Sequence, residues 1–282
     1  MIEQLNIYGK NKVEVAIERL KLFEPEEGYY LAFSGGKDSV VVKALADMAG
    51  VKYDAHYSHT SVDPPELIQY IKDVHPDVLI DYPRYKDGTR ITMWNLIPKK
   101  KMPPTRIVRY CCAELKESGG DGRFTITGAR WDESAKRKNN QGIVTVYKAG
   151  KEFDGNSDFQ KNISGGVVLT NDNSESRQLI DTCYQRKKTV LNPIIDWTTE
   201  EVWEFIRKHD IPYCKLYDDG YKRLGCIGCP MSNKNAEELE RHPKYKKAYL
   251  SAFGRMLEIR KENGLKCGWE TPEDVMNWWL RK

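Results

Sequence analysis

Residues Tyr29–Val42, which read YYLAFSGGKDSVVV, carry the pattern on which both fold and function depend. The apolar run over 30–33 is typical of a buried strand, and the apolar spacing after the turn predicts a helix over 37–49. A serine–glycine turn at 34–36 lies between them. A strand, a glycine turn and a helix start together form an anion site, because backbone N–H groups converge there and the helix dipole favours negative charge.

The residues of this turn are the candidate nucleotide ligands: Ser34, Gly35, Gly36, Lys37, Asp38 and Ser39. Lys37 adds a cation and the serines add hydroxyl donors. The spacing is not that of a Walker-type loop. It resembles the Ser-Gly-Gly-x-Asp-Ser loop of the PP-loop ATP pyrophosphatases, which cleave between the α and β phosphates. The resemblance implies that the turn binds ATP and that Asp38 orients the loop or helps to hold Mg²⁺. A glycine turn that binds nothing is the alternative.

Cysteine placement is the second pattern. The chain has seven cysteines: Cys111, Cys112, Cys183, Cys214, Cys226, Cys229 and Cys267. The first ten residues lack the apolar core of a signal peptide, so a disulfide framework is not expected and grouped cysteines indicate metal or redox chemistry. The tandem pair at 111–112 and the Cys-x-x-Cys turn at 226–229 together offer four thiolates.

These four cysteines are the candidate metal ligands. Four thiolates suit a [4Fe–4S] cluster or a tetrahedral zinc ion. Adjacent cysteines suit one small ion less well, since their side chains diverge, but the spacing leaves cluster, zinc and unmetallated thiols all open. A cysteine pair followed far downstream by Cys-x-x-Cys resembles the cluster motif of the iron–sulfur adenylyl-sulfate reductases. This resemblance implies a [4Fe–4S] cluster held by Cys111, Cys112, Cys226 and Cys229.

Composition narrows the class of protein. With 282 residues the chain can bury a large core, and its 40% hydrophobic content includes no run as long as a membrane span. We therefore expect a cytoplasmic protein without a membrane partner, and a homo-oligomer. The net charge of +4 does not by itself predict nucleic-acid binding. Basic residues do gather near 99–109, 130–138 and 186–188. The first and third groups are either solvated side chains or contacts to a nucleic-acid backbone.

The order of expected elements predicts an α/β fold with a parallel, doubly wound sheet and a helical C-terminal part. Strands are expected over 29–33, 51–57, 78–82 and 124–127, alternating with helices. Ligands on such sheets bind beyond the carboxyl ends of the strands, where Ser34 and Gly128 would lie.

Three divisions of the chain are expected. Residues 1–24 form an N-terminal helical segment, 25–225 the nucleotide-binding domain and 226–282 a helical C-terminal region. A polar insertion at 138–180, with strand-like pieces at 143–147 and 167–170, interrupts the domain and is expected to form a hairpin or a lid.

Several further segments resemble the phosphoadenosine phosphosulfate reductase family. They are TGARxxESxxR at 127–137, NPIIDWT at 192–198, and the run from Ile211 to Cys226. The resemblance implies an adenine nucleotide α-hydrolase-like fold. Gly128 and Arg130 are then expected to contact the nucleotide, and Arg130 and Arg137 suit a phosphate because guanidinium binds oxyanions bidentately. Thr60, after the second strand, is a further candidate nucleotide contact.

Two departures from the family pattern favour ATP as the substrate. Reductases of activated sulfonucleotides typically have another residue in place of the loop lysine. Here the lysine is present as Lys37, and its positive charge can stabilise pyrophosphate as a leaving group. Their C-terminal Glu-Cys-Gly-(Ile/Leu)-His tail has only a partial match around Cys267. The preferred hypothesis is an ATP pyrophosphatase of sulfur transfer that adenylates an acceptor, with Lys37, Asp38, Arg130 and Arg137 as catalytic residues. A protein that combines an ATP-type loop with a cluster resembles the ATP pyrophosphatases of DNA phosphorothioation.

The partners implied are an adenine nucleotide, a sulfur-donor protein of the cysteine desulfurase kind and a nucleic-acid acceptor. Two alternatives stay open. An adenylyl-sulfate or phosphoadenylyl-sulfate reductase would use Cys267 as nucleophile and release sulfite. A non-catalytic nucleotide-binding or nucleic-acid-binding metalloprotein would bind without turnover, although such a protein has no use for a residue that stabilises a leaving group.

Overall fold

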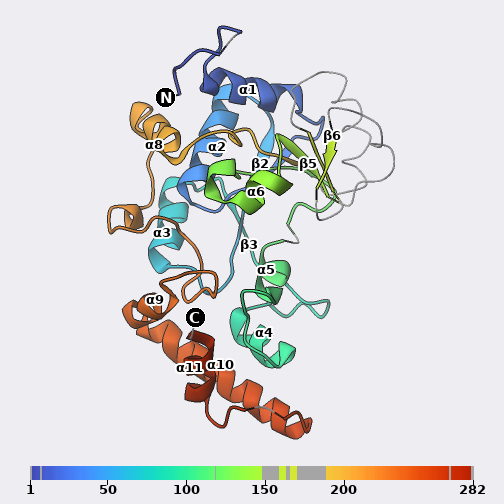
Figure 1. Ribbon diagram of the computed structural model, residues 1–282, viewed down its shortest axis with the longest axis vertical. Coiled ribbons are helices and arrows are strands. Elements are labelled where there is room, and N and C mark those ends of the chain that lie inside the picture. The colour runs from blue at the N-terminus through green and yellow to red at the C-terminus, as the bar shows by residue number, and fades with distance from the viewer. Residues whose placement is uncertain are drawn as a thin grey trace. The chain divides into compact units, whose positions relative to one another are not determined.

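The computed structural model describes residues 2–6, 8–117, 119–147, 159–162, 166–169, 189–266 and 268–280 (Figure 1). The chain forms two compact units that are interleaved in sequence. The first unit comprises Met1–Tyr57, Tyr70–Leu79 and Gly119–Gly220, and the second comprises Ser58–Gln69, Ile80–Ser118 and Tyr221–Lys282. The three contiguous divisions expected from the sequence stay a prediction.

In the part of the chain that the structure describes, eight strands form one mixed sheet, and the α/β class is confirmed. The strands are β1 (Tyr29–Ala32), β2 (Tyr53–Ser58), β3 (Leu79–Asp81), β4 (Phe124–Ile126), β5 (Val144–Val146), β6 (Phe159–Lys161), β7 (Val167–Leu169) and β8 (Thr189–Leu191). Their order is β3-β2-β1-β4-β8-β5-β7-β6. Strand β1 pairs in parallel with β2 and β4, and β4 pairs in parallel with β8. The chain therefore runs outward from β1 to β3 and returns to β4 on the other side of β1, which makes the β1–β4 boundary a topological switch point.

The expected insertion contributes to this sheet instead of interrupting it. Strand β5 pairs antiparallel with β8 and β7, and β7 pairs antiparallel with β6. The strand-like pieces expected at 143–147 and 167–170 are thus confirmed as an antiparallel extension of a parallel sheet. Most of the remaining insertion lies outside the described residues, so its expected role as a lid stays a prediction.

Helices of the first unit surround the sheet region. They are α1 (Lys12–Leu22), α2 (Lys37–Ala49), α6 (Ala135–Asn140), α8 (Thr199–Lys208) and the 3-10 turns η1 (Trp131–Glu133) and η3 (Lys215–Tyr217), while α3 (Pro65–Val74) continues from the second unit into the first. Helices α1 and α8 both pack on α2. The apolar side of α2 is buried through Val40, Val41 and Leu45, as the spacing predicts.

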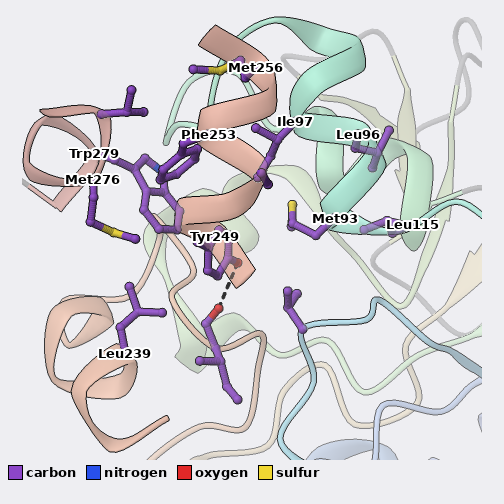
Figure 2. Packing of buried hydrophobic residues seen from close by; sticks show 14 of the residues in the cluster. Met93, Leu96, Ile97, Leu115, Leu239, Tyr249, Phe253, Met256, Met276 and Trp279 are labelled. Carbon is purple, nitrogen blue, oxygen red and sulfur yellow. Dashed lines mark hydrogen bonds between the residues drawn. The ribbon is translucent and has the colours of Figure 1, made fainter. Parts of the chain in front are cut away.

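The second unit has its own hydrophobic core. Its helices are α4 (Met93–Lys100), α5 (Tyr110–Leu115), α9 (Asn235–Arg241), α10 (Pro243–Glu262) and α11 (Pro272–Leu280). Helix α10 packs against α4, α9 and α11. Figure 2 shows the packed side chains, with Phe253 and Trp279 in edge-to-face contact at 5.6 Å between ring centroids. Trp279 Nε1 also donates to Pro104 O at 2.6 Å, so the indole nitrogen is satisfied inside the core.

No helix in the described part of the chain is both long enough and apolar enough to span a bilayer.

Candidate functional site

The serine–glycine turn joins β1 to α2 in the first unit. Gly35 has φ +69°, a conformation that favours glycine, and Gly36 is the residue before the helix. Gly36 has no side chain to cap the helix, and its own N–H donates to Ser34 Oγ at 3.3 Å. Ser39 Oγ donates to Gly36 O at 2.9 Å and lies 3.1 Å from Ser34 Oγ. The turn therefore has the shape expected of a phosphate-binding loop, and the two serine hydroxyls hold it.

The charged residues of the loop form a chain of ion pairs. Lys37 Nζ lies 2.8 Å from Asp38 Oδ2, and Arg130 Nε lies 2.8 Å from Asp38 Oδ1. The Lys37 side chain is 8% exposed and that of Asp38 is 23% exposed. Asp38 thus pairs with both cations, and its single negative charge leaves the group with a net positive charge. An incoming phosphate or metal ion would compete for the same groups, because a carboxylate and a phosphate bind the same cations.

Arg130 is held by more than Asp38. Its side chain is 1% exposed. Nη1 donates to Asp132 Oδ2 at 3.3 Å and to Trp197 O at 3.1 Å, and Nη2 donates to Thr199 Oγ1 at 3.3 Å. These bonds make Arg130 a positioning residue that fixes Asp38 against the start of α8. Its expected contact with a nucleotide phosphate stays a prediction.

Gly128 and Arg137 are the remaining first-unit residues that the sequence predicted for the nucleotide site. A Cβ at Gly128 would lie 2.8 Å from the backbone carbon of Asp38, so only glycine lets the segment after β4 pack this closely on the loop. Arg137 Nη1 lies 3.0 Å from Glu133 and its side chain is 31% exposed. The structure therefore brings Gly128 to the loop, and it pairs Arg137 with the glutamate four residues before it.

Sequence reasoning missed one residue at the loop. The backbone N–H of Lys37 donates to Tyr217 Oη at 2.9 Å. Tyr217 follows Lys37 by 180 residues, and no local spacing signals the contact. The segment that contains Tyr217 resembles the family as a whole, but that resemblance does not single out this tyrosine.

Thr60 belongs to the second unit and is 1% exposed. Its backbone N–H donates to Asp63 Oδ2 and its hydroxyl to Asp63 Oδ1, both at 2.7 Å, and the hydroxyl lies 3.6 Å from Cys226 Sγ. These contacts attach Thr60 to the Cys-x-x-Cys turn. Its expected contact with the nucleotide stays a prediction.

The four candidate metal ligands all lie in the second unit. Cys111 and Cys112 are on α5, and the turn at 226–229 precedes α9. Cys229 N donates to Cys226 O at 3.2 Å, which closes the turn. All four cysteines are half-buried.

Two hydrogen bonds to the backbone of Ile227, together with one glycine, hold the Cys-x-x-Cys turn. Ile227 N donates to Val62 O at 2.8 Å, and Tyr249 Oη donates to Ile227 O at 3.1 Å, the bond dashed in Figure 2. Gly228 has φ +70°, and its N–H donates to Glu238 Oε2 at 3.1 Å. The turn is therefore tied to the hydrophobic core through Tyr249 and to α9 through Glu238.

The thiols influence one another electrostatically. A hydrogen bond from Cys111 lowers the pKa of Cys112 to about 5, and the Arg109 guanidinium, 3.3 Å from Cys112 Sγ, acts in the same direction. The same bond raises the pKa of Cys111, as do burial and electrostatic interactions with the thiols of Cys112, Cys226 and Cys229. Burial raises the pKa of Cys229. The opposite directions of the two shifts favour a thiolate at Cys112 over one at Cys111.

Cations accompany these thiols. Electrostatic interaction with Cys226 raises the pKa of Lys116. Lys116 and Arg109 thus place positive charge beside the thiols. Among the described residues, no three His, Cys, Asp or Glu side chains form a group that could hold a metal ion. The [4Fe–4S] cluster expected from the sequence therefore stays a prediction.

Comparisons with known proteins identify the family. The phosphoadenosine phosphosulfate reductase domain matches residues 28–232. The chain belongs to this family. The match includes the loop, Arg130, the cysteine pair and the Cys-x-x-Cys turn, so the resemblance expected from the sequence motifs is confirmed.

The individual relatives of this chain include both uncharacterized proteins and reductases. It is 24% identical to an uncharacterized protein of Methanocaldococcus jannaschii over 257 residues, covering 89% of this chain and 51% of that protein. It is 39% identical to the adenosine 5'-phosphosulfate reductase of Staphylococcus haemolyticus over 75 residues, covering 24% of this chain and 31% of that enzyme. The chain thus spans about half the length of these curated relatives or less.

A solved structure similar to this chain is the phosphoadenylyl-sulfate reductase of Candida auris in its phosphate complex. Its TM-score is 0.42 with 12% sequence identity, and the alignment covers 79% of this chain and 96% of that one. The family match, rather than this distant structural likeness, supports a general nucleotide-using role.

Proposed function

We propose that the protein is an ATP pyrophosphatase of sulfur transfer. The supporting observation is the complete loop with Lys37 and Asp38 at the switch point of the sheet. A lysine in this position contributes most when a diphosphate leaves, because negative charge then builds up beside it. The nucleotide would be ATP, bound with Mg²⁺.

The proposed reaction has two displacements. An acceptor oxygen attacks the α-phosphorus, a new P–O bond forms, and the bond to the bridging oxygen breaks with its electron pair leaving on pyrophosphate. Lys37 and the N–H groups at the start of α2 neutralise that charge. A thiol reductant releases sulfide from the persulfide of a donor protein such as a cysteine desulfurase. The sulfide attacks the adenylated acceptor, a bond from sulfur to the acceptor forms, and the bond from the acceptor to the oxygen of AMP breaks with its electron pair leaving on AMP. Asp38 pairs with both Lys37 and Arg130, so a bound phosphate would compete with Asp38 for these cations.

A [4Fe–4S] cluster is the cofactor that the second unit would hold. Cys111, Cys112, Cys226 and Cys229 would be its ligands, with Lys116 and Arg109 offsetting their charge. When bound, such a cluster supplies redox chemistry and a place to hold sulfur. The acceptor is proposed to be a nucleic acid, as in phosphorothioation, and the basic residues near 99–109 support this choice. The third basic group, at 186–188, lies outside the described residues.

One assay tests the reaction. Protein purified without oxygen is incubated with ATP, Mg²⁺, acceptor DNA or RNA and a sulfide source, and pyrophosphate, AMP and sulfite are measured. Pyrophosphate and AMP in equal amounts are expected. Absence of AMP in every combination of acceptor and sulfide source would contradict the proposal.

The metal content is tested separately. Iron and acid-labile sulfide should copurify with the wild type, and Cys226→Ser should lose them. Cys214→Ala, which removes a buried thiol outside the group of four, should retain them. Equal iron content in both variants, or zinc in place of iron, would overturn the assignment of the cluster ligands.

A sulfonucleotide reductase is the second candidate. The stretch that is 39% identical to an adenosine 5'-phosphosulfate reductase favours it. It requires Cys267 as nucleophile, a residue that lies outside the described part of the chain. Sulfite release from adenylyl sulfate or phosphoadenylyl sulfate with a thiol reductant, abolished by Cys267→Ser, would promote this candidate over the first.

A further inference from the structure

A tyrosine hydroxyl occupies one of the donors of the phosphate loop. Lys37 is the first residue of α2, so its N–H is one of the donors at a helix start that have no partner within the helix. Such N–H groups are what a helix offers to a phosphate. Here that N–H donates to Tyr217 Oη at 2.9 Å. The hydroxyl therefore lies where an oxygen of a bound phosphate would lie.

A backbone hydrogen bond and two aromatic contacts hold Tyr217 in this position. It ends the turn η3, and its N–H donates to Cys214 O at 3.1 Å. Its ring meets Trp203 of α8 edge-on, with centroids 5.1 Å apart and an interplanar angle of 87°. Tyr213 packs on the same tryptophan, also with 5.1 Å between ring centroids. The hydroxyl is thus held in place by aromatic packing.

The space above the turn is narrow. A Cβ added at Gly36 would lie 3.4 Å from Tyr217 Oη and 3.3 Å from Ser34 Oγ. One N–H makes a single well-aligned bond, so a phosphate oxygen and the phenol oxygen compete for Lys37 N–H. A charged phosphate oxygen accepts a hydrogen bond roughly twice as strong as that of a neutral hydroxyl.

We propose that Tyr217 is a specificity-determining residue of the loop. Its hydroxyl satisfies Lys37 N–H in the free protein and is displaced only by a strongly charged phosphate group. Water and neutral ligands do not displace it, since they gain no more from the N–H than the phenol already supplies. This inference rests on the proposed function, because it takes the loop to be the phosphate site.

The test is the affinity for inorganic pyrophosphate, measured by calorimetry on the full chain. Tyr217→Phe keeps the ring against Trp203 and removes only the competing oxygen. Pyrophosphate should then bind about five-fold more tightly, the equivalent of one ordinary hydrogen bond, while adenosine binds as before. Tyr213→Phe is the matched control: its hydroxyl donates to Asp218 at 3.0 Å, so pyrophosphate affinity should not change.

A second measurement reports displacement directly. In protein labelled with ¹⁵N-lysine, the amide signal of Lys37 should differ between free wild type and free Tyr217→Phe. With saturating pyrophosphate the two signals should coincide, since the hydroxyl has left the amide. Weaker or unchanged pyrophosphate binding by Tyr217→Phe, or bound signals that stay apart, would overturn the proposal.

The outcomes separate this inference from the proposed function. If the wild type binds pyrophosphate but Tyr217→Phe binds it no more tightly, only the proposed role of Tyr217 is wrong. If the wild type binds no pyrophosphate, the proposed role of Tyr217 and the proposed function are both wrong. If pyrophosphate binding behaves as expected but ATP is never converted to AMP, the proposed reaction is wrong and the role of Tyr217 is retained.

Discussion

Asp38 and Arg130 form an ion pair in which the guanidinium Nε lies 2.8 Å from the carboxylate Oδ1. The pair joins the start of α2 to the segment after β4, two parts of the chain that come after neighbouring parallel strands. Because Arg130 also binds Trp197 O and Thr199, it connects the loop to the start of α8. Arg130 therefore links three segments of the candidate site: the loop, the segment after β4 and the start of α8.

Removing that guanidinium should destabilise the protein. Arg130→Gln is expected to lower the free energy of unfolding by about 3 kcal/mol, because it removes a buried guanidinium that bonds to Asp38, Trp197 O and Thr199. Urea unfolding measures this. Arg137→Gln breaks a pair whose arginine is 31% exposed and should cost under about 0.5 kcal/mol. Equal losses in the two variants would show that Arg130 does not have this role.

The loop lysine should act on the chemical step. Lys37→Met is expected to reduce the rate of pyrophosphate release from ATP by about 100-fold or more, because the departing charge loses its cation. Lys43→Met, which removes a lysine of the same helix paired with Asp77 at 2.9 Å, should keep the wild-type rate. Steady-state release of pyrophosphate measures both. A Lys37→Met enzyme with a normal rate would place the leaving group elsewhere.

The glycine of the Cys-x-x-Cys turn should tolerate no side chain. Gly228 has φ +70°, and an added Cβ would lie 3.0 Å from Leu239 Cδ2. Gly228→Ala is therefore expected to cost roughly 2–4 kcal/mol, from left-handed strain and overpacking together. Gly264 has φ +64° with nothing within 4 Å, so Gly264→Ala isolates the strain alone at about 1 kcal/mol. Thermal and urea unfolding compare them, and equal costs would exclude the contact with Leu239.

Acid should weaken the first unit through His75. Burial lowers the pKa of His75, and the positive charge of Lys43 lowers it further. The imidazole packs against Phe33 at 4.8 Å and contacts Tyr70 Oη at 2.9 Å. Since the folded pKa lies below the unfolded value near 6.5, this stability is present above pH 6.5 and is lost as the pH falls through the folded pKa.

The histidine can be separated from other acid effects by substitution. Unfolding free energy measured from pH 7.5 to 5 should fall less steeply for His75→Gln than for the wild type. His209→Gln, at an exposed position after α8, should keep the wild-type slope. A His75→Gln protein with the full wild-type slope would rule His75 out as the source.

The sequence predicted the parts of the fold that are encoded locally. The helix expected over 37–49 has those bounds in the structure, because glycines at 36 and 50 flank it and its apolar spacing is regular. Strand β8 was missed, because it has only three residues, Thr189–Leu191, and comes directly after a basic run. The sequence predicted a helical segment over 1–24, and the helix in the structure is shorter, Lys12–Leu22. It begins after Asn11, which forms a capping box with Glu14.

Contacts between distant segments of sequence were not predictable in the same way. The loop motif indicated Lys37 and Asp38 as site residues, but not that Asp38 pairs with Lys37 and Arg130 at once. Arg130 was chosen for its charge, and its burial results from the way β4 and β8 lie side by side. The bond from Lys37 to Tyr217 depends on the position of η3, and the spacing of residues in the sequence does not predict that position.

The interleaving of the two units has a consequence for how this chain can be cut and recombined. The boundaries fall at 57/58, 69/70, 79/80, 118/119 and 220/221, so each unit is assembled from separate stretches of the polypeptide. No single truncation yields either unit intact, and a ribosome must have made the residues from Tyr221 onward before the cysteine-bearing unit can be complete. Gene fusion or exchange of one unit between relatives would need several simultaneous crossovers, so the two are expected to be inherited as one piece.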